Sequence, residues 1–149
     1  LNDDFYSRFS DAERSRIMPV WNKNLDNQWY ASRGGEDTLD YIFLLSIEEV
    51  VCKYFGDSSE KLINRSPKQK YWFGNKDENN DRRAAVLDGY GWWWWLRSPG
   101  RDNRRAAYIH YDGNVGIQGN GTFRYNSKNI HPTGNNCGGV RPALWLSLD

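Results

Sequence analysis

Four consecutive tryptophans at residues 92–95 constrain the fold of this chain more than any other feature. A strand places successive side chains on opposite faces, so Trp92, Trp94 and Leu96 would face one side of a sheet. Trp93 and Trp95 would face the other side. Indoles bury large apolar areas, so we expect a central strand with both faces covered and one indole reaching a binding surface. An exposed aromatic platform that stacks on sugars or bases is the alternative.

Length and composition favour a single folded domain over residues 1–149. Aromatic residues make up 15% of the chain, whereas disordered chains are poor in them. The 20 basic and 19 acidic residues give a net charge of +1, so we expect no nucleic-acid partner. No apolar run approaches the ~20 residues that cross a bilayer, so we expect no membrane-spanning segment. The chain starts at Leu1 without a visible signal peptide, which indicates a processed chain or an excerpt.

Helix-capping patterns mark the N-terminal half. Ser10 and Glu13 have capping-box spacing, which predicts a helix that runs to about Met18 and ends at Pro19. Residues 41–45 form a short apolar run, which indicates a buried strand.

A second capping box is expected at Ser46 and Glu49, opening a helix that ends near Gly56. Four apolar residues fall at i, i+3, i+4 and i+7 and should form its buried stripe: Ile47, Val50, Val51 and Tyr54.

Strands are predicted in the C-terminal half. Residues 57–91 are expected to be mostly irregular. Residues 106–111 and 115–117 are predicted strands around Asp112-Gly113, a dipeptide typical of hairpins. Residues 140–148 are expected to form a closing strand. Helices followed by strands indicate an α+β domain.

The sequence carries no strong catalytic or metal-binding pattern. His110 and His131 lack cysteine or carboxylate neighbours at metal-ligand spacing. The acidic stretch at residues 77–81 does not match an EF-hand, and a solvated loop is favoured there. Cys52 is expected to behave as a small hydrophobe; a disulfide with Cys137, or a Cys/His nucleophile pair, is the alternative. We therefore expect a non-catalytic protein with no metal and no cofactor.

The segment from residue 101 to 139 is rich in Asn, Gly, Arg and Tyr, which suits recognition better than a core. From residue 97 to 131 there are six basic and two acidic residues, so an anionic ligand is an alternative to a protein ligand. Strand alternation should place Tyr108 and His110 on one face. A solvated loop region without function is the competing interpretation. The predicted ligand-binding residues are Arg101, Asn103, Arg104, Arg105, Tyr108, His110, Asn114, Gln118, Asn120, Arg124 and Tyr125.

Several separated motifs occur in an order that resembles the DUF6273 family. They are Trp-Trp-Trp-Leu-Arg-Ser-Pro-Gly at 93–100, Ala-Ala-Tyr-Ile at 106–109, Asp-Gly-Asn-Val at 112–115 and Gly-Val-Arg-Pro-Ala-Leu-Trp-Leu at 139–146. Upstream, Phe-Ser-Asp-Ala-Glu at 9–13 and the segment 37–46 also match. The resemblance covers nearly the whole chain. It implies an α+β, C-type lectin-like fold of the formylglycine-generating-enzyme type, with N-terminal helices, a small mostly antiparallel sheet and long loops. The family's usual Trp-containing start is missing before Leu1, so we expect a truncated N-terminal edge.

The resemblance also suggests a function. Some related domains are variable proteins of diversity-generating retroelements, in which surface codons are mutated ahead of a Gly-x-Arg-Pro-Ala-like strand; residues 139–143 occupy that position here. This implies a display domain for a protein or cell-surface ligand, located at the cell surface, in the secreted fraction or on a phage. Related enzymes need a reactive cysteine pair that Cys52 and Cys137 do not match. The calcium-lectin motifs are absent, so calcium-dependent sugar binding is not expected.

Five residues are expected to be scaffold: Arg97, Asp112, Gly113, Arg141 and Pro142. Both arginines should anchor loops through hydrogen bonds to carbonyls or carboxylates. Two competing functions remain open, a carbohydrate-binding module with exposed Trp or Tyr, and an enzyme related to the formylglycine generators.

Overall fold

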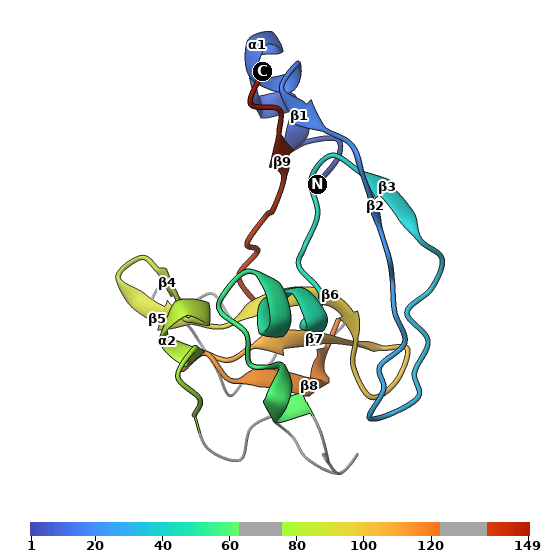
Figure 1. Ribbon diagram of the computed structural model, residues 1–149, viewed down its shortest axis with the longest axis vertical. Helices are drawn as coiled ribbons and strands as arrows, with labels where there is room; N and C mark the ends of the chain where they lie inside the picture. Colours follow the sequence, from blue (N-terminus) through green and yellow to red (C-terminus); the bar gives the residue numbers. More distant parts are fainter. Residues whose placement is uncertain (63–75, 123–136) are drawn as a thin grey trace.

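The computed structural model describes residues 1–62, 76–122 and 137–149 and has the expected α+β architecture (Figure 1). Its helical segments are short: 3₁₀ helices η1 (Tyr6–Arg8) and η3 (Ser59–Leu62), α-helices α1 (Asp11–Arg14) and α2 (Asn80–Arg83), and a π-helical turn η2 (Glu49–Lys53). The strands are β1 (Ile17–Met18), β2 (Val20–Asn22), β3 (Thr38–Asp40), β4 (Ala85–Leu87), β5 (Tyr90–Trp92), β6 (Trp94–Pro99), β7 (Arg105–Ile109), β8 (Val115–Gly121) and β9 (Trp145–Leu146). Within the described residues they pair into small antiparallel sheets ordered β1–β9, β2–β3, β4–β5 and β6–β7–β8.

The main hydrophobic core lies between the inner face of β6–β7–β8 and the helical segment that contains η2 (Figure 1). The sheet contributes Trp94, Leu96, Ala107, Ile109, Val115 and Ile117. Val50 and Val51 of η2 are completely buried against them. Each such buried aliphatic side chain stabilises the fold by roughly 1.5–3 kcal/mol.

A second cluster covers the outer face of the sheet. Trp93 packs edge-on against Trp95 and Tyr108, with ring centroids 4.7 and 5.5 Å apart. Glycines leave room for these rings: a Cβ on Gly138 would lie 2.4 Å from the Trp93 ring, and one on Gly116 would lie 2.5 Å from the ring of Tyr108. The predicted split of the tryptophans between two faces is confirmed for Trp93 to Trp95.

Trp92 departs from that prediction. It ends β5, and the chain leaves strand geometry at Trp93 before β6 begins. Trp92 therefore packs with the outer cluster, and its Nε1 donates to the Cys137 carbonyl at 2.9 Å. Residues 92–94 are buried and Trp95 is half-buried, so most of the run is core and one indole approaches the surface, as expected.

Both predicted capping boxes are present. Ser10 Oγ accepts from the Glu13 backbone N–H at 3.3 Å, and Glu13 accepts from the Ser10 N–H at 2.8 Å. The predicted helix to Met18 is nevertheless too long, because α1 ends at Arg14. The following segment instead pairs with the C-terminal chain as β1–β9, with Ile17 buried.

Ser46 and Glu49 form the second capping box. The stripe prediction fails at one residue: Tyr54 follows the last helical residue and is exposed, with its ring against Trp145 of β9. Gly56 has the positive φ, 94°, that suits the end of this segment.

Two predicted strands shrink to short pairings. Residues 41–45 are buried in part, and among the described residues they form a single bridge, between Phe43 and Ala143, with reciprocal hydrogen bonds of 3.0 and 2.8 Å. In place of the closing strand predicted at residues 140–148, the structure has the bridge at Ala143 and the short strand β9. Figure 1 shows β1–β9 and β2–β3 extending away from the central sheet, with both chain ends near them.

One hairpin was missed in the stretch expected to be irregular. Asp88 and Gly89 join β4 to β5 and both have positive φ, 51° and 84°. This geometry belongs to the type I′ turn that Asp-Gly favours. The same dipeptide signal that predicted the 112–113 hairpin was therefore present here.

Arg97 joins β6 to the second capping box. Its guanidinium makes a two-pronged contact with Glu49, one arm at 3.0 Å, and donates to the Leu44 carbonyl at 2.8 Å. The two charged side chains are only 15% and 12% exposed. The prediction that Arg97 anchors a loop through a carbonyl and a carboxylate is confirmed.

The variant Glu49→Gln keeps an acceptor for Ser46 but removes the charge opposite Arg97. We expect it to lower the free energy of unfolding by about 2 kcal/mol at neutral pH. Burial opposes ionisation of Glu49, but hydrogen bonds from Arg97 and Ser46 outweigh it and lower the pKa of Glu49 below its ordinary 4.5. This stabilisation is present above the unfolded-state pKa and is lost as the pH falls through the lower folded-state pKa, so the difference between wild type and variant should shrink in acid.

Urea unfolding of wild type, Glu49→Gln and the control Glu48→Gln measures this effect. Glu48 is the exposed neighbour, and its replacement should change stability by less than about 0.5 kcal/mol. Equal losses in both variants, or a difference that persists in acid, would contradict the assignment.

Candidate functional site

The turn between β6 and β7 exposes three of the predicted binding residues: Arg101, Asn103 and Arg104. Asp102 orders this turn. Its carboxylate accepts from the Arg104 N–H at 3.0 Å and lies 3.4 Å from the guanidinium nitrogens of Arg101 and Arg105. The Arg104 hydrogen bond and the neighbouring arginines lower the pKa of Asp102. The turn therefore presents more positive than negative charge on an ordered backbone.

Gln118 and Asn120 of β8 lie beside this turn. Both side chains are half-buried and neither belongs to the main core. The backbone ties them to the turn, because the Arg101 N–H donates to the Gln118 carbonyl at 2.9 Å. We call these six residues the polar edge: Arg101, Asn103, Arg104, Arg105, Gln118 and Asn120.

His110 and Asn114 lie at the opposite end of the hairpin, in the loop 110–114. The His110 Nδ1 is 2.9 Å from the Asp112 carboxylate, which also accepts from the Asn114 N–H at 3.1 Å. Partial burial opposes ionisation of Asp112, but these hydrogen bonds outweigh it and lower its pKa. The length of β7 separates this loop from the polar edge by about 13 Å, so the predicted residues form two groups.

Tyr108 does not belong to either group. It is 3% exposed and packs against Trp93, with Gly116 below its ring. The prediction that Tyr108 contacts ligand on one face with His110 is wrong, because its ring is needed to cover the outer cluster and His110 follows the end of β7. Arg124 and Tyr125 lie outside the described residues.

A buried polar cluster under the 110–114 loop was not predicted. Arg83 and Asp77 form an ion pair of 2.7 Å with both side chains at most 1% exposed, and Arg83 Nε donates to the Gly113 carbonyl at 3.0 Å. Asn80 donates to the Asp112 carbonyl at 3.1 Å. The solvated loop expected at 77–81 is wrong, since Asp77 and Asn80 instead anchor the hairpin. The cluster of acidic and amide residues at 77–81 is the local signal for such a polar anchor.

The scaffold role predicted for Asp112 and Gly113 is supported by this cluster. Gly113 has φ 82°, and a Cβ there would lie 1.9 Å from the Asn80 carbonyl oxygen. Arg141 behaves differently from the prediction. It makes no hydrogen bond within the described chain and instead lies over the rings of Phe55 and Trp94, at 4.9 and 5.2 Å. Partial burial lowers its pKa.

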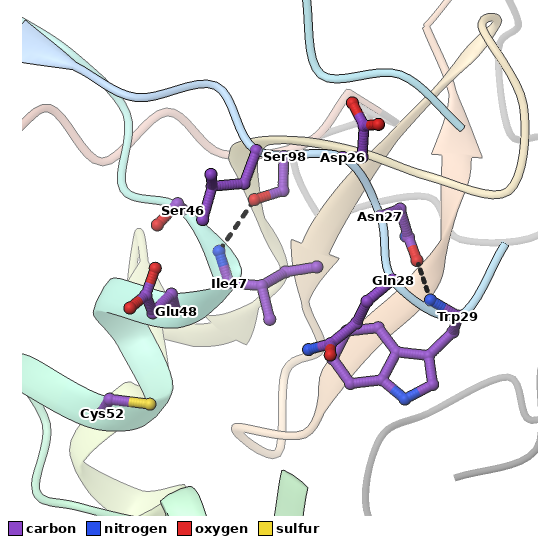
Figure 2. Close-up of a pocket in the computed structure, with 10 residues that line it drawn as sticks. Asp26, Asn27, Gln28, Trp29, Ser46, Ile47, Glu48, Cys52 and Ser98 are labelled. Atoms are coloured by element: carbon purple, nitrogen blue, oxygen red, sulfur yellow. Dashed lines mark hydrogen bonds between the residues drawn. The ribbon is translucent and has the colours of Figure 1, made fainter. Parts of the chain in front are cut away.

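A pocket of about 350 Å³ lies between residues 26–29 and the helical segment 46–52 (Figure 2). Figure 2 shows the Ile47 and Gln28 side chains and the Cys52 sulfur directed into it. Its central polar groups already bond within the fold: Asn27 donates to the carbonyls of Pro99 and Ile117, and Ser98 Oγ accepts from the Ile47 N–H.

Cys52 gives this pocket no activated nucleophile. Burial, followed by the negative charges of Asp57 and Glu48, raises the pKa of its thiol. A raised pKa keeps a thiol protonated, and the thiolate is the reactive form. Cys52 and Cys137 form no disulfide with each other.

Neither a metal-ligand cluster nor a membrane-spanning helix is found among residues 1–62, 76–122 and 137–149. In these ranges no three His, Cys, Asp or Glu side chains gather closely enough to hold a metal ion. No helix in the same ranges has the length and apolarity to traverse a bilayer.

A model of the family described as "Domain of unknown function (DUF6273)" matches residues 1–148. The chain belongs to the DUF6273 family. No curated protein and no solved structure matches it. In this DUF6273 domain, the motifs that carried the resemblance are structural in large part: 93–100 holds β6, and 112–115 forms the anchored hairpin loop.

Gly113→Ala and Gly89→Ala separate backbone strain from steric contact in the DUF6273 domain. Both glycines have nearly the same positive φ, but a Cβ on Gly89 would meet nothing within 4 Å. We expect Gly89→Ala to cost about 1 kcal/mol and Gly113→Ala about 3 kcal/mol, because Asn80 must also move. Urea unfolding measures both, and amide chemical shifts of His110 and Asn114 report the loop. Equal losses would refute the close approach to Asn80.

Proposed function

We propose that this DUF6273 domain is a non-catalytic binding domain that presents the polar edge to a protein or cell-surface ligand. The observation that carries the proposal is the exposure of Arg101, Asn103 and Arg104 on a turn that the backbone holds in place. An ordered turn loses little conformational entropy when a partner binds. Trp93, Trp94 and Tyr108 lie in the core, so the edge can change without loss of the fold.

The charge of the polar edge suggests the kind of ligand. Three arginines surround Asp102, and Arg101 and Arg104 are exposed. Guanidinium groups bind carboxylates through two parallel hydrogen bonds, so an acidic patch on a protein or glycan is the complementary surface. Such binding weakens with added salt.

The finer fold assignment is part of the proposal. Short helices, small antiparallel sheets and long connections support the C-type lectin-like fold that the family resemblance implies. We also propose that the coding segment ahead of residues 139–143 is diversified by a retroelement. The genomic locus tests this: a reverse transcriptase and a near-copy of the segment differing mainly at adenines are expected. A locus without both leaves a binding domain of fixed sequence.

Arrays of cell-surface proteins and glycans test the binding function. We expect wild type to bind at least one acidic target, and Arg101→Ala/Arg104→Ala to bind it at least tenfold more weakly, because each charge-assisted bond contributes about 1.5–3 kcal/mol. The control is Arg33→Ala, another exposed arginine, which should bind as wild type. If both variants lose binding, or if neither does, the polar edge is not the ligand-binding surface.

A carbohydrate-binding module is the second candidate, favoured by Trp21. Its side chain is 70% exposed on β2, with Leu39 opposite on β3. An exposed indole offers a flat apolar face for a sugar ring.

Trp21→Ala distinguishes the two candidates on the glycan array. If sugar stacking on β2–β3 is the function, this variant loses glycan binding while Arg101→Ala/Arg104→Ala retains it. Glycan binding that is unchanged in Trp21→Ala rejects the second candidate. Circular dichroism of the variant checks that the fold is intact.

A further inference from the structure

Arg141 is a half-buried cation with no anionic partner in the described structure. Its guanidinium lies over the rings of Phe55 and Trp94, and its Nη1 is fully buried without a hydrogen-bond acceptor. The other enclosed arginines differ in having a carboxylate partner, Asp77 for Arg83 and Glu49 for Arg97. Arg97 Nε, like Arg141 Nη1, is buried without a hydrogen bond, so the missing carboxylate is what distinguishes Arg141. A buried donor without an acceptor costs free energy unless a ligand supplies the acceptor.

Arg141 lines a pocket of about 320 Å³ beside the tryptophan run. Its other lining residues are uncharged: residues 84–87, the three indoles of 92–94, Gly139 and Val140. Arg141 is thus the single charged residue among the described residues that line this pocket. The volume lies near the lower end of the range for small-molecule sites, so the occupant would be small.

A second donor at this pocket also lacks an acceptor. Trp93 is 5% exposed and its Nε1 is buried without a hydrogen bond, whereas Trp92 Nε1 donates to the Cys137 carbonyl and Trp94 Nε1 to the Arg83 carbonyl. Indole N–H groups usually find a partner when buried. Two residues that line this largely apolar pocket, one of them charged, therefore each carry a buried donor without an acceptor.

We propose that this pocket binds a small organic carboxylate. The guanidinium donors lie in the plane of the group, while its contacts with aromatic rings use its face, so the in-plane donors remain available to a planar carboxylate. The apolar walls formed by Ala85, Leu87 and the indoles suit an aromatic or aliphatic body. A carboxylate fits one guanidinium better than a phosphate does, because phosphate sites gather several cations or backbone N–H groups.

This site is separate from the polar edge and does not depend on the proposed function. A free carboxylic acid and the C-terminal carboxylate of a peptide share the required chemistry. The experiment below compares both sources.

Titration of the indole N–H signals in ¹H–¹⁵N spectra tests the proposal. The probes are 3-phenylpropionate, its neutral analogue 3-phenylpropanol, and the peptide Ala-Ala-Phe with a free or amidated C-terminus, all at equal ionic strength. We expect a saturable shift of the Trp93 signal, assigned with Trp93→Phe, with 3-phenylpropionate or the free-acid peptide. The neutral analogue of the binding probe should bind at least tenfold more weakly.

Arg141→Gln should abolish the preference for the carboxylate, and Arg141→Lys should weaken it. The matched control Arg82→Gln removes an exposed arginine of α2 and should bind as wild type. If Arg141→Gln does not fold, wild type and Arg141→Lys decide the result. The proposal is overturned if neither carboxylate gives a saturable shift, if the neutral analogues bind equally well, or if a folded Arg141→Gln binds like wild type.

Discussion

Burial of neighbouring indoles on opposite faces of one strand is the constraint on which this structure depends. Trp94 enters the main core, where helical residues cover it, while Trp93 needs a second cover on the outer face. That cover is formed by Tyr108 and by close approach of Gly138. The chain near Gly139 also pairs with β6, so it is held where it covers the outer face. Both sides of the sheet are thereby used by the core, and the exposed turn residues Arg101, Asn103 and Arg104 lie at one of its ends.

Features determined by residues close in sequence could be predicted. The two capping boxes require only a Ser and a Glu three residues apart, and the 112–113 hairpin requires a glycine that tolerates positive φ. The identity of the exposed turn residues Arg101, Asn103 and Arg104 also followed from local composition. The β4–β5 hairpin carries the same Asp-Gly signal at residues 88–89, so it too is encoded by residues close in sequence.

Features determined by distant partners could not be predicted. Tyr108 has the amphipathic side chain of a binding residue, and only the indole of Trp93 and the missing side chain of Gly116 decide that it is buried. The sequence of residues 77–81 resembles a solvated loop. Its buried position depends on Arg83, which pairs with Asp77 and donates to a carbonyl of the 112–113 hairpin. The length of the strand predicted at residues 41–45 also depends on a distant partner. Within the described residues this segment pairs at one position, Phe43 with Ala143.

The arginines show how one residue type acquires different roles from its surroundings. Burial opposite a carboxylate makes Arg83 and Arg97 structural, because removing one member of either ion pair would leave the other charge buried without a partner. Exposure leaves Arg101 and Arg104 available to a partner at small cost to stability. Arg141 fits neither group: it is enclosed enough to lose water around Nη1, yet it lacks the carboxylate that accompanies the other two enclosed arginines. Phe55 and Trp94 contact the face of the Arg141 guanidinium but supply no acceptor for its N–H groups. A buried arginine is expected to pair with a carboxylate, as Arg83 and Arg97 do, and at Arg141 the described chain supplies none.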